Sequence, residues 1–205
     1  MNIRPIVLTY WGQESKKLQS LEKHLRENDI TNFSYFYGIQ GKGLRARKIQ
    51  GLEYFTDIYE MSGKCLGQNL SHWHLWSALK MEYERHGGDD YWNIFEDDIR
   101  LDKGWEQRYM DVMEDMPWDW DIILFGNCCS EGREFTKVTD NILKGGSLCL
   151  HWYAVRYKAL DTLRGTNDIP QSRVDIQMAL KSYKELNVYT IKPRLAGQFG
   201  INLPL

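Results

Sequence analysis

The chain has 205 residues, a formal net charge of −2, 42% hydrophobic residues and 26% charged residues, as expected for one globular domain with its own core. The near-zero net charge gives no basis for binding nucleic acid or an anionic membrane, and no apolar run is long enough to cross a bilayer. The first residues hold too short an apolar stretch for a signal peptide, so we expect a single cytoplasmic domain over residues 1–205.

The N-terminal part is expected to alternate strands and a helix. Residues 6–10 form a short apolar run that predicts a first strand. Residues 13–26 carry leucines at helical spacing and predict a helix. The aromatic residues 33–37 predict a second strand that ends at Gly38.

A glycine-containing stretch over residues 38–51 predicts a loop, and its basic side chains stand out in a nearly neutral chain. Lys42 and Arg45 are candidates for a mobile flap that neutralises a diphosphate. A solvated surface loop accounts for the same residues equally well, and both interpretations stay open.

The longest predicted helix covers residues 67–86 and ends at the pair Gly87-Gly88. His72 lies near its start, on the face that also carries Leu75 and Leu79 at helical spacing. A lone histidine on a packed face is most often a hydrogen-bonded core residue.

An aromatic and β-branched strand at residues 91–95 runs directly into three carboxylates, Glu96, Asp97 and Asp98. Because side chains alternate along a strand, Glu96 and Asp98 point to one side, with Cα atoms about 7 Å apart, and Asp97 points to the other. Like charges at that distance repel by about 2 kcal/mol at an effective dielectric constant of about 20. Ligands bind at the carboxyl ends of strands in α/β sheets, and Mg²⁺ or Mn²⁺ prefers oxygen ligands, so the triplet predicts a metal–diphosphate site. The alternative is a solvated acidic turn in which Asp97 or Asp98 pairs with Arg100.

The second half continues the alternation. Asp102 is the expected N-cap of a helix that ends near Met116. Strands are expected at residues 120–125, 147–155 and 188–191, helices at 157–164 and 172–186, a loop or hairpin at 130–146, and a loose tail at the end. Gly126 is expected to stop the first of these strands. Strand–helix alternation along the whole chain predicts an α/β fold with a mainly parallel central sheet flanked by helices.

Four cysteines stand at positions 65, 128, 129 and 149. They form no CxxC pair, and adjacent cysteines are poorly spaced for a zinc site. We therefore expect reduced, partly buried thiols.

Three segments follow one another in a recognisable order: residues 67–76 (GQNLSHWHLW), 94–99 (IFEDDI) and 120–126 (WDIILFG). This order resembles glycosyltransferase family 25, which includes bacterial lipooligosaccharide galactosyltransferases and procollagen galactosyltransferases. The family pattern is a G-x-x-x-S-H helix, a strand ending in EDD and a W-D-I strand. Residues 152–155, 169–175 and 193–198 are similar to its aromatic strand, its P-V-D element and its closing P-x-hydrophobic-x-x-Q.

The resemblance implies a Rossmann-like domain of the GT-A type and an inverting transfer of galactose or glucose from a UDP-sugar to a glycan or hydroxylysine acceptor. Mn²⁺ (or Mg²⁺) would be held by Glu96 and Asp98, and Asp175, in the first turn of a helix, would be the catalytic base. A carboxylate at this position is also favoured by the helix dipole alone, so a purely structural role for Asp175 stays open. The candidate donor-binding residues are Thr9, Tyr10, Lys42, Arg45, Ser71, His72 and Asp97. Lys42 and Arg45 are candidates because of the basic charge of their loop and not because of the resemblance.

Departures from the family pattern keep other functions open. Thr9-Tyr10 replaces an expected Asn-Leu, and the spacing from Pro170 to Asp175 is looser than in P-V-D. No histidine follows His151, so the C-terminal metal-binding histidine of many GT-A enzymes is missing, with Gln198 or water as its substitute. A GT-A-fold glycan-binding module without turnover is therefore an alternative. A metal-dependent phosphoesterase ranks last, because the histidines are not expected to cluster with the EDD triplet.

Overall fold

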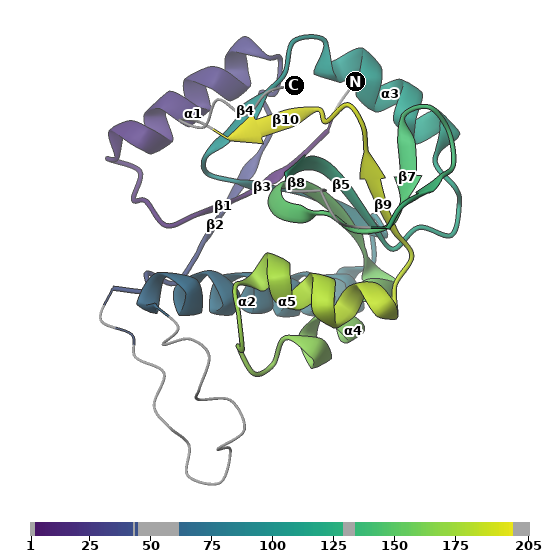
Figure 1. Ribbon diagram of the computed structural model, residues 1–205. Coiled ribbons are helices and arrows are strands. Elements are labelled where there is room, and N and C mark those ends of the chain that lie inside the picture. Colours follow the sequence, from purple (N-terminus) through teal and green to yellow (C-terminus); the bar gives the residue numbers. More distant parts are fainter. Residues whose placement is uncertain (1–2, 43, 45–61, 129–133, 199–205) are drawn as a thin grey trace, which may run out of the picture.

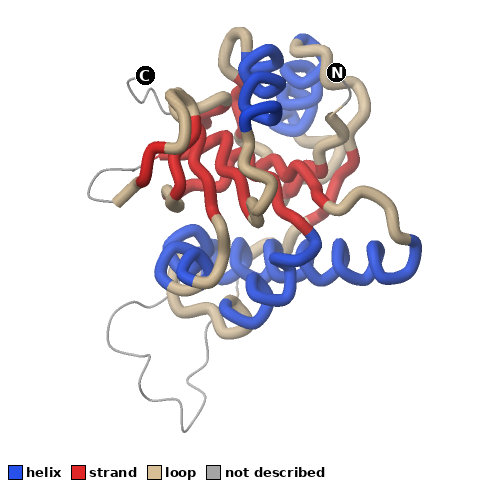
Figure 2. The backbone as a smooth tube through the Cα atoms, turned by 90° about the vertical axis from the view of Figure 1, so that its right-hand side faces the viewer, coloured by secondary structure: helices blue, strands red, loops and turns tan. Residues whose placement is uncertain are grey.

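The computed structural model describes residues 3–42, 44, 62–128 and 134–198. A central sheet lies between two layers of helices (Figures 1 and 2). The strands of this sheet are β1 (Ile6–Thr9), β2 (Ser34–Tyr37), β3 (Tyr91–Glu96), β5 (Ile122–Cys128), β6 (Thr136–Lys137), β7 (Ile142–Lys144), β8 (Leu148–Arg156) and β9 (Val188–Ile191). A separate small sheet pairs β4 (Ile99–Leu101) with β10 (Ala196–Gln198).

The strand order in the central sheet is β2-β1-β3-β8-β5-β9-β7-β6. Pairing is parallel between β1 and β2, β1 and β3, and β5 and β9, whereas β8 is antiparallel to both β3 and β5. Consequently β2, β1, β3, β5, β9 and β6 run in one direction, and β8 and β7 run against them. The mainly parallel α/β sheet is confirmed, and its antiparallel insert β8 lies at the centre.

The helices are α1 (Lys16–Glu27), α2 (Gly63–His86), α3 (Trp105–Asp115), α4 (Leu160–Thr166) and α5 (Val174–Leu180), with 3₁₀ turns at Tyr157–Ala159 and Ser182–Lys184. Helices α1 and α3 cover one face of the sheet, and α2, α4 and α5 cover the other (Figure 1). Each face has its own buried cluster, with Leu21 of α1 and Trp105 of α3 in one and Trp76 of α2 and Met178 of α5 in the other. No described helix combines the length and the apolar character needed to cross a bilayer.

Local signals account for the ends of the two long helices. The Ser15 hydroxyl accepts from the backbone of Lys17 and caps α1, and the Ser62 hydroxyl does the same for α2 through Cys65. Gly87, with φ of 66°, ends α2 as predicted.

Several predictions in the second half are wrong. Helix α3 begins at Trp105, after Gly104 in a left-handed conformation, and Asp102 is not its N-cap. The tail residues 196–198, predicted to be loose chain, form strand β10, which pairs with β4 at residues 99–101. Both strands depend on this long-range partnership, which no local pattern reveals. The helix predicted at 172–186 is likewise shorter, because α5 ends at Leu180 and a 3₁₀ turn follows.

Gly126 lies inside β5 and does not end it, contrary to the prediction. A Cβ at this position would lie 2.9 Å from the Trp152 backbone nitrogen and 3.1 Å from the His151 Cβ. The missing side chain therefore permits the close approach of β5 to β8 at a shift in their register.

We expect Gly126→Ala to lower the free energy of unfolding by about 1–3 kcal/mol, because the added methyl group must displace β8. Chemical denaturation would measure this loss. Gly165→Ala is the matched control, since nothing lies within 4 Å of a Cβ there inside α4, and it should stabilise the protein by about 0.5–1 kcal/mol. Equal effects of the two substitutions would contradict the steric argument.

Cys128 and Cys149 form a disulfide, which corrects the prediction of reduced thiols for this pair. The two residues lie on the adjacent strands β5 and β8, with Cα atoms 5.6 Å apart, within the range that a disulfide spans. Cys65 is a free thiol, and Cys129 lies outside the described residues.

Candidate metal centre

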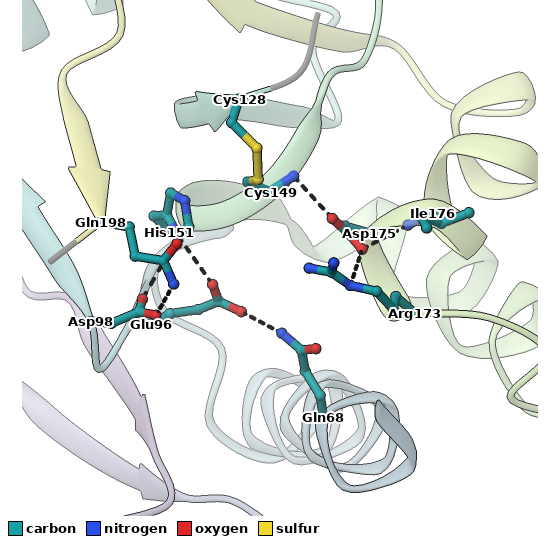
Figure 3. Close-up of a disulfide and its surroundings, with 10 residues drawn as sticks. All are labelled: Gln68, Glu96, Asp98, Cys128, Cys149, His151, Arg173, Asp175, Ile176 and Gln198. Carbon is teal, nitrogen blue, oxygen red and sulfur yellow. Dashed lines mark hydrogen bonds and ion pairs between the residues drawn. A yellow bond between two sulfur atoms is a disulfide. The ribbon is translucent and has the colours of Figure 1, made fainter. Parts of the chain in front are cut away.

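Glu96, Asp98 and His151 converge at the carboxyl end of β3 (Figure 3). Phe95 of β3 pairs with Trp152 of the antiparallel strand β8, so the next position along the same register sets His151 opposite Glu96. Asp98 lies in the turn that joins β3 to β4. One potential ligand atom from each residue lies within 4.8 Å of the others.

The chemistry of this group of three residues, called the acid–histidine triad below, fits a divalent cation. His151 Nδ1 lies 3.4 Å from Glu96 Oε2 and 3.7 Å from Asp98 Oδ1. The His151 and Glu96 side chains are only 7% and 14% exposed. His151 Nδ1 and Asp98 Oδ1 are buried atoms without a hydrogen-bond partner among the described residues. Two carboxylates and an imidazole nitrogen that face one another in this way are suitable ligands for Mn²⁺ or Mg²⁺.

The side chains of the triad shift one another's pKa values. Burial alone would raise the pKa of Glu96, but the adjacent His151 and His72 side chains outweigh it and hold that pKa far below its ordinary value. Burial would lower the pKa of His151, but Asp98 and Glu96 raise it to about 9. The two carboxylates therefore favour a positive charge between them. A proton on the His151 ring supplies that charge, and a bound metal ion would take its place.

Gln198 completes one side of the triad. Strand β10 pairs with β4, and the Gln198 side-chain nitrogen donates a hydrogen bond to Asp98 Oδ2. Gln198, the expected substitute for the missing C-terminal histidine, thus lies beside the acid–histidine triad, although its side-chain nitrogen and not its oxygen makes the contact.

A buried chain of hydrogen bonds orients Glu96 from behind. Trp76 Nε1 donates to the Tyr153 hydroxyl at 3.0 Å, and that hydroxyl lies 3.0 Å from His72 Nδ1. Because the Glu96 carboxylate only accepts, its hydrogen bond with His72 uses a proton on Nε2, and Nδ1 can then accept from the Tyr153 hydroxyl. His72 Nε2 lies 3.4 Å from Glu96 Oε1, and Gln68 Nε2 donates to the same oxygen at 3.1 Å. Glu96 Oε1 is held by α2, and Oε2 faces His151.

We expect His72→Asn to weaken Mn²⁺ binding about tenfold or more, because asparagine is too short to reach Glu96 and residues behind a metal ligand commonly contribute this much. Asparagine keeps a polar atom near Tyr153, so the helix should stay folded. Titration calorimetry with Mn²⁺ is the measurement, and His74→Asn, on the exposed side of the same helix, is the matched control. Unchanged affinity in His72→Asn would show that His72 only fills the core.

Asp97 points away from the acid–histidine triad, as predicted. Its Oδ2 accepts from the Thr9 hydroxyl at 2.9 Å and from the Tyr10 backbone nitrogen at 3.0 Å. Burial raises the pKa of Asp97, and the two hydrogen bonds oppose that rise. The alternative role of the EDD triplet does not occur, since no ion pair joins Arg100 to Asp97 or Asp98 within the described ranges. Asp97 instead joins the carboxyl ends of β1 and β3.

The remaining donor-binding candidates lie at different places. The Ser71 hydroxyl donates to Gly67 O at 2.6 Å and accepts from the Ile39 backbone at 2.7 Å, so it ties α2 to the segment after β2. Burial raises the pKa of Tyr10, whose ring lies beside the same segment. Lys42 is exposed, and Arg45 lies outside the described residues.

Asp175 is buried in the first turn of α5, across from the acid–histidine triad (Figure 3). Its Oδ2 accepts from the Cys149 backbone nitrogen at 3.2 Å, and its Oδ1 accepts from the Ile176 backbone nitrogen at 3.0 Å. Arg173 Nε lies 3.7 Å from Oδ1, and this side chain is 57% exposed. In Figure 3 the Arg173 guanidinium extends away from α5, in the direction of Gln68 and Glu96.

The sequence-based reasoning missed His151 and named His72 only as a donor-binding candidate. His151 belongs to the triad and His72 contacts Glu96, so the expectation that histidines stay away from the EDD triplet is wrong. The missing signal was the antiparallel insertion of β8 beside β3, since only that register brings a residue near position 150 to Glu96. If β8 ran parallel to β3, His151 would lie at the other end of the sheet from Glu96.

No protein-family model and no curated protein sequence matches the chain. Its fold matches a crystal structure of a glycosyltransferase involved in the glycosylation of the major capsid of PBCV-1, with a TM-score of 0.55 and 7% identity over 97% of this chain and 94% of that chain. Less similar are A197 from STIV (TM-score 0.45, 10% identity, 96% and 83% covered) and S. aureus TarS (0.38, 13%, 97% and 60%). The chain thus has a glycosyltransferase fold, whereas membership of family 25 stays a prediction.

Proposed function

We propose that the protein is a metal-dependent glycosyltransferase that moves a hexose, galactose or glucose, from a UDP-sugar to a hydroxyl group of a glycan or a hydroxylysine, with inversion. The observation that carries this proposal is the acid–histidine triad at the carboxyl end of β3. In open α/β sheets this edge is where ligands bind, and the fold is that of a glycosyltransferase.

Glu96, Asp98 and His151 would hold Mn²⁺ or Mg²⁺. When bound, such a cation neutralises the charge that develops on the leaving diphosphate. Glu96 offers Oε2 for this role because Gln68 and His72 occupy Oε1. Asp98 offers Oδ1, since Gln198 binds its other oxygen.

Asp175 is the proposed base that takes the proton from the acceptor hydroxyl. An inverting transfer needs a carboxylate held in a fixed direction on the acceptor side. Two backbone N–H groups donate to the Asp175 carboxylate, one to each oxygen, and together they fix its direction. Arg173 and Lys42 are the proposed cations that approach the diphosphate from the solvent side.

Asp97 and the end of β1 form the proposed donor side. The hydrogen bonds from Thr9 and Tyr10 both reach Asp97 Oδ2. Its Oδ1 is the proposed acceptor for a hydroxyl group of the donor sugar. Ser71 and His72 have a positioning role in this proposal and do not contact the donor. Ser71 holds the segment after β2, and His72 holds Glu96.

The alternative of a module without turnover was based on a missing metal-binding histidine and on the altered N-terminal motif at Thr9-Tyr10. His151 supplies an imidazole to the same carboxylates, so the first of these two arguments for the alternative loses its basis. The phosphoesterase hypothesis gains a histidine by the same observation, but the fold similarity favours sugar transfer.

A screen for nucleotide release across nucleotide sugars in Mn²⁺ tests the proposal. We expect UDP release from UDP-galactose or UDP-glucose that stops when EDTA removes the metal. The absence of both binding and turnover for every nucleotide sugar would contradict it, and hydrolysis of simple phosphate esters would favour the phosphoesterase instead.

A further inference from the structure

The pairing of β5 with β8 becomes irregular close to the candidate site. Leu124 pairs with Tyr153, Gly126 with Trp152 and Cys128 with Leu148, with register shifts between these positions. Cys149 falls within the irregular part and has a positive φ of 68°, a conformation that residues with a side chain seldom adopt. The disulfide to Cys128 is a covalent link across this distorted stretch.

Cys149 is also the residue that ties Asp175 to the sheet. Among the contacts of the described residues, Asp175 receives one hydrogen bond from Ile176 and lies near Arg173, and both belong to its own segment. The hydrogen bond from the Cys149 backbone, 3.2 Å long, is the one that comes from β8. Figure 3 shows the disulfide, the Cys149 nitrogen and the Asp175 carboxylate in this order.

The acid–histidine triad is anchored in a different way. The regular register of β3 with β8 runs from Tyr91–Arg156 to Phe95–Trp152 and ends beside His151. Glu96 is held by Gln68 and His72 of α2. Neither anchor involves the disulfide, so the metal ligands and Asp175 have separate supports.

We propose that Cys149 is a positioning residue, and that its disulfide with Cys128 holds its N–H group against Asp175 so that turnover depends on the disulfide while metal and donor binding do not. This inference rests on the proposed function. A dithiol would open the link: the S–S bond takes up two electrons and two protons and becomes two thiols, and the dithiol is oxidised to its own disulfide. The site would then lose the fixed direction of its base.

The test uses the full chain with Cys65→Ser and Cys129→Ser, which removes competing thiols. Treatment with dithiothreitol should lower kcat for UDP-sugar turnover by about ten- to a hundredfold, with KM for the donor and Mn²⁺ affinity changed by less than about twofold. Reoxidation should restore kcat, and Cys128→Ser/Cys149→Ser should behave like the reduced protein. In Asp175→Asn the residual turnover should not respond to dithiothreitol, because the disulfide acts through that carboxylate.

Other outcomes would overturn the inference. If reduction leaves kcat unchanged, the disulfide has no role in turnover. If reduction unfolds the chain, as seen by circular dichroism, or lowers Mn²⁺ affinity together with kcat, the disulfide stabilises the whole fold and does not act on Asp175 in particular. Hydrogen exchange separates this failure from failure of the proposed function. Faster amide exchange of residues 147–151 and 173–176 on reduction, with α2 unchanged, supports the positioning role of the disulfide even if no nucleotide sugar is turned over. Unchanged exchange refutes that role.

Discussion

Replacing Asp98 by asparagine is expected to lower metal-dependent UDP release by at least about a hundredfold, while the chain stays folded. The substitution removes one of the two carboxylates of the triad and leaves a neutral amide that binds Mn²⁺ poorly. The Asp98 side chain is 37% exposed, so the fold does not depend on its burial. UDP release is measured at saturating donor over a range of Mn²⁺ concentrations.

Asp89→Asn is the matched control for this experiment. Asp89 is exposed and lies just before the opposite end of β3, so the same chemical change there should leave UDP release unaltered. Full activity of Asp98→Asn, or an equal loss in both variants, would remove Asp98 from the metal site.

Replacing Asp175 by alanine is expected to keep UDP-sugar binding and to lower kcat by about 10²- to 10⁴-fold, the usual contribution of a general base. Asp175 lies on α5, whereas Thr9 and Asp97 lie at the ends of β1 and β3, and Arg173, the one proposed donor contact beside Asp175, is 57% exposed and stays in the variant, so affinity for the donor should change little. Steady-state kinetics gives kcat, and calorimetry with UDP in Mn²⁺ gives the affinity.

Asp161→Ala is the control, because Asp161 is an exposed carboxylate in the first turn of the neighbouring helix α4. It should leave kcat within about twofold of the unchanged protein. If Asp175→Ala instead abolishes donor binding, the residue belongs to the donor side and another group must take the acceptor proton.

Local patterns predicted much of the fold. The leucines of α1, the glycines after α2 and the aromatic-rich run of β3 carry their information within a few residues, and those elements appear close to the expected positions. The EDD triplet also has the expected geometry, with Asp97 turned toward Thr9 and the other two carboxylates turned toward one chemical group.

The missed features all depend on partners far apart in the chain. Strands β4 and β10 are short and form because each supplies the other with hydrogen bonds. Likewise, His151 reaches Glu96 and Cys149 reaches Cys128 only because β8 runs antiparallel between β3 and β5. Composition and spacing carry no information on that insertion, so the histidine of the triad and the disulfide had no local signal.

The most direct test is a crystal structure of the protein with Mn²⁺ and UDP, recorded at a wavelength where manganese scatters anomalously. The account predicts one strong anomalous peak bound by Glu96, Asp98 and His151, with the UDP diphosphate on its open side. UDP or Mn²⁺ bound elsewhere, while His151 keeps its contacts with both carboxylates, would contradict the assignment of this cluster as the catalytic metal site.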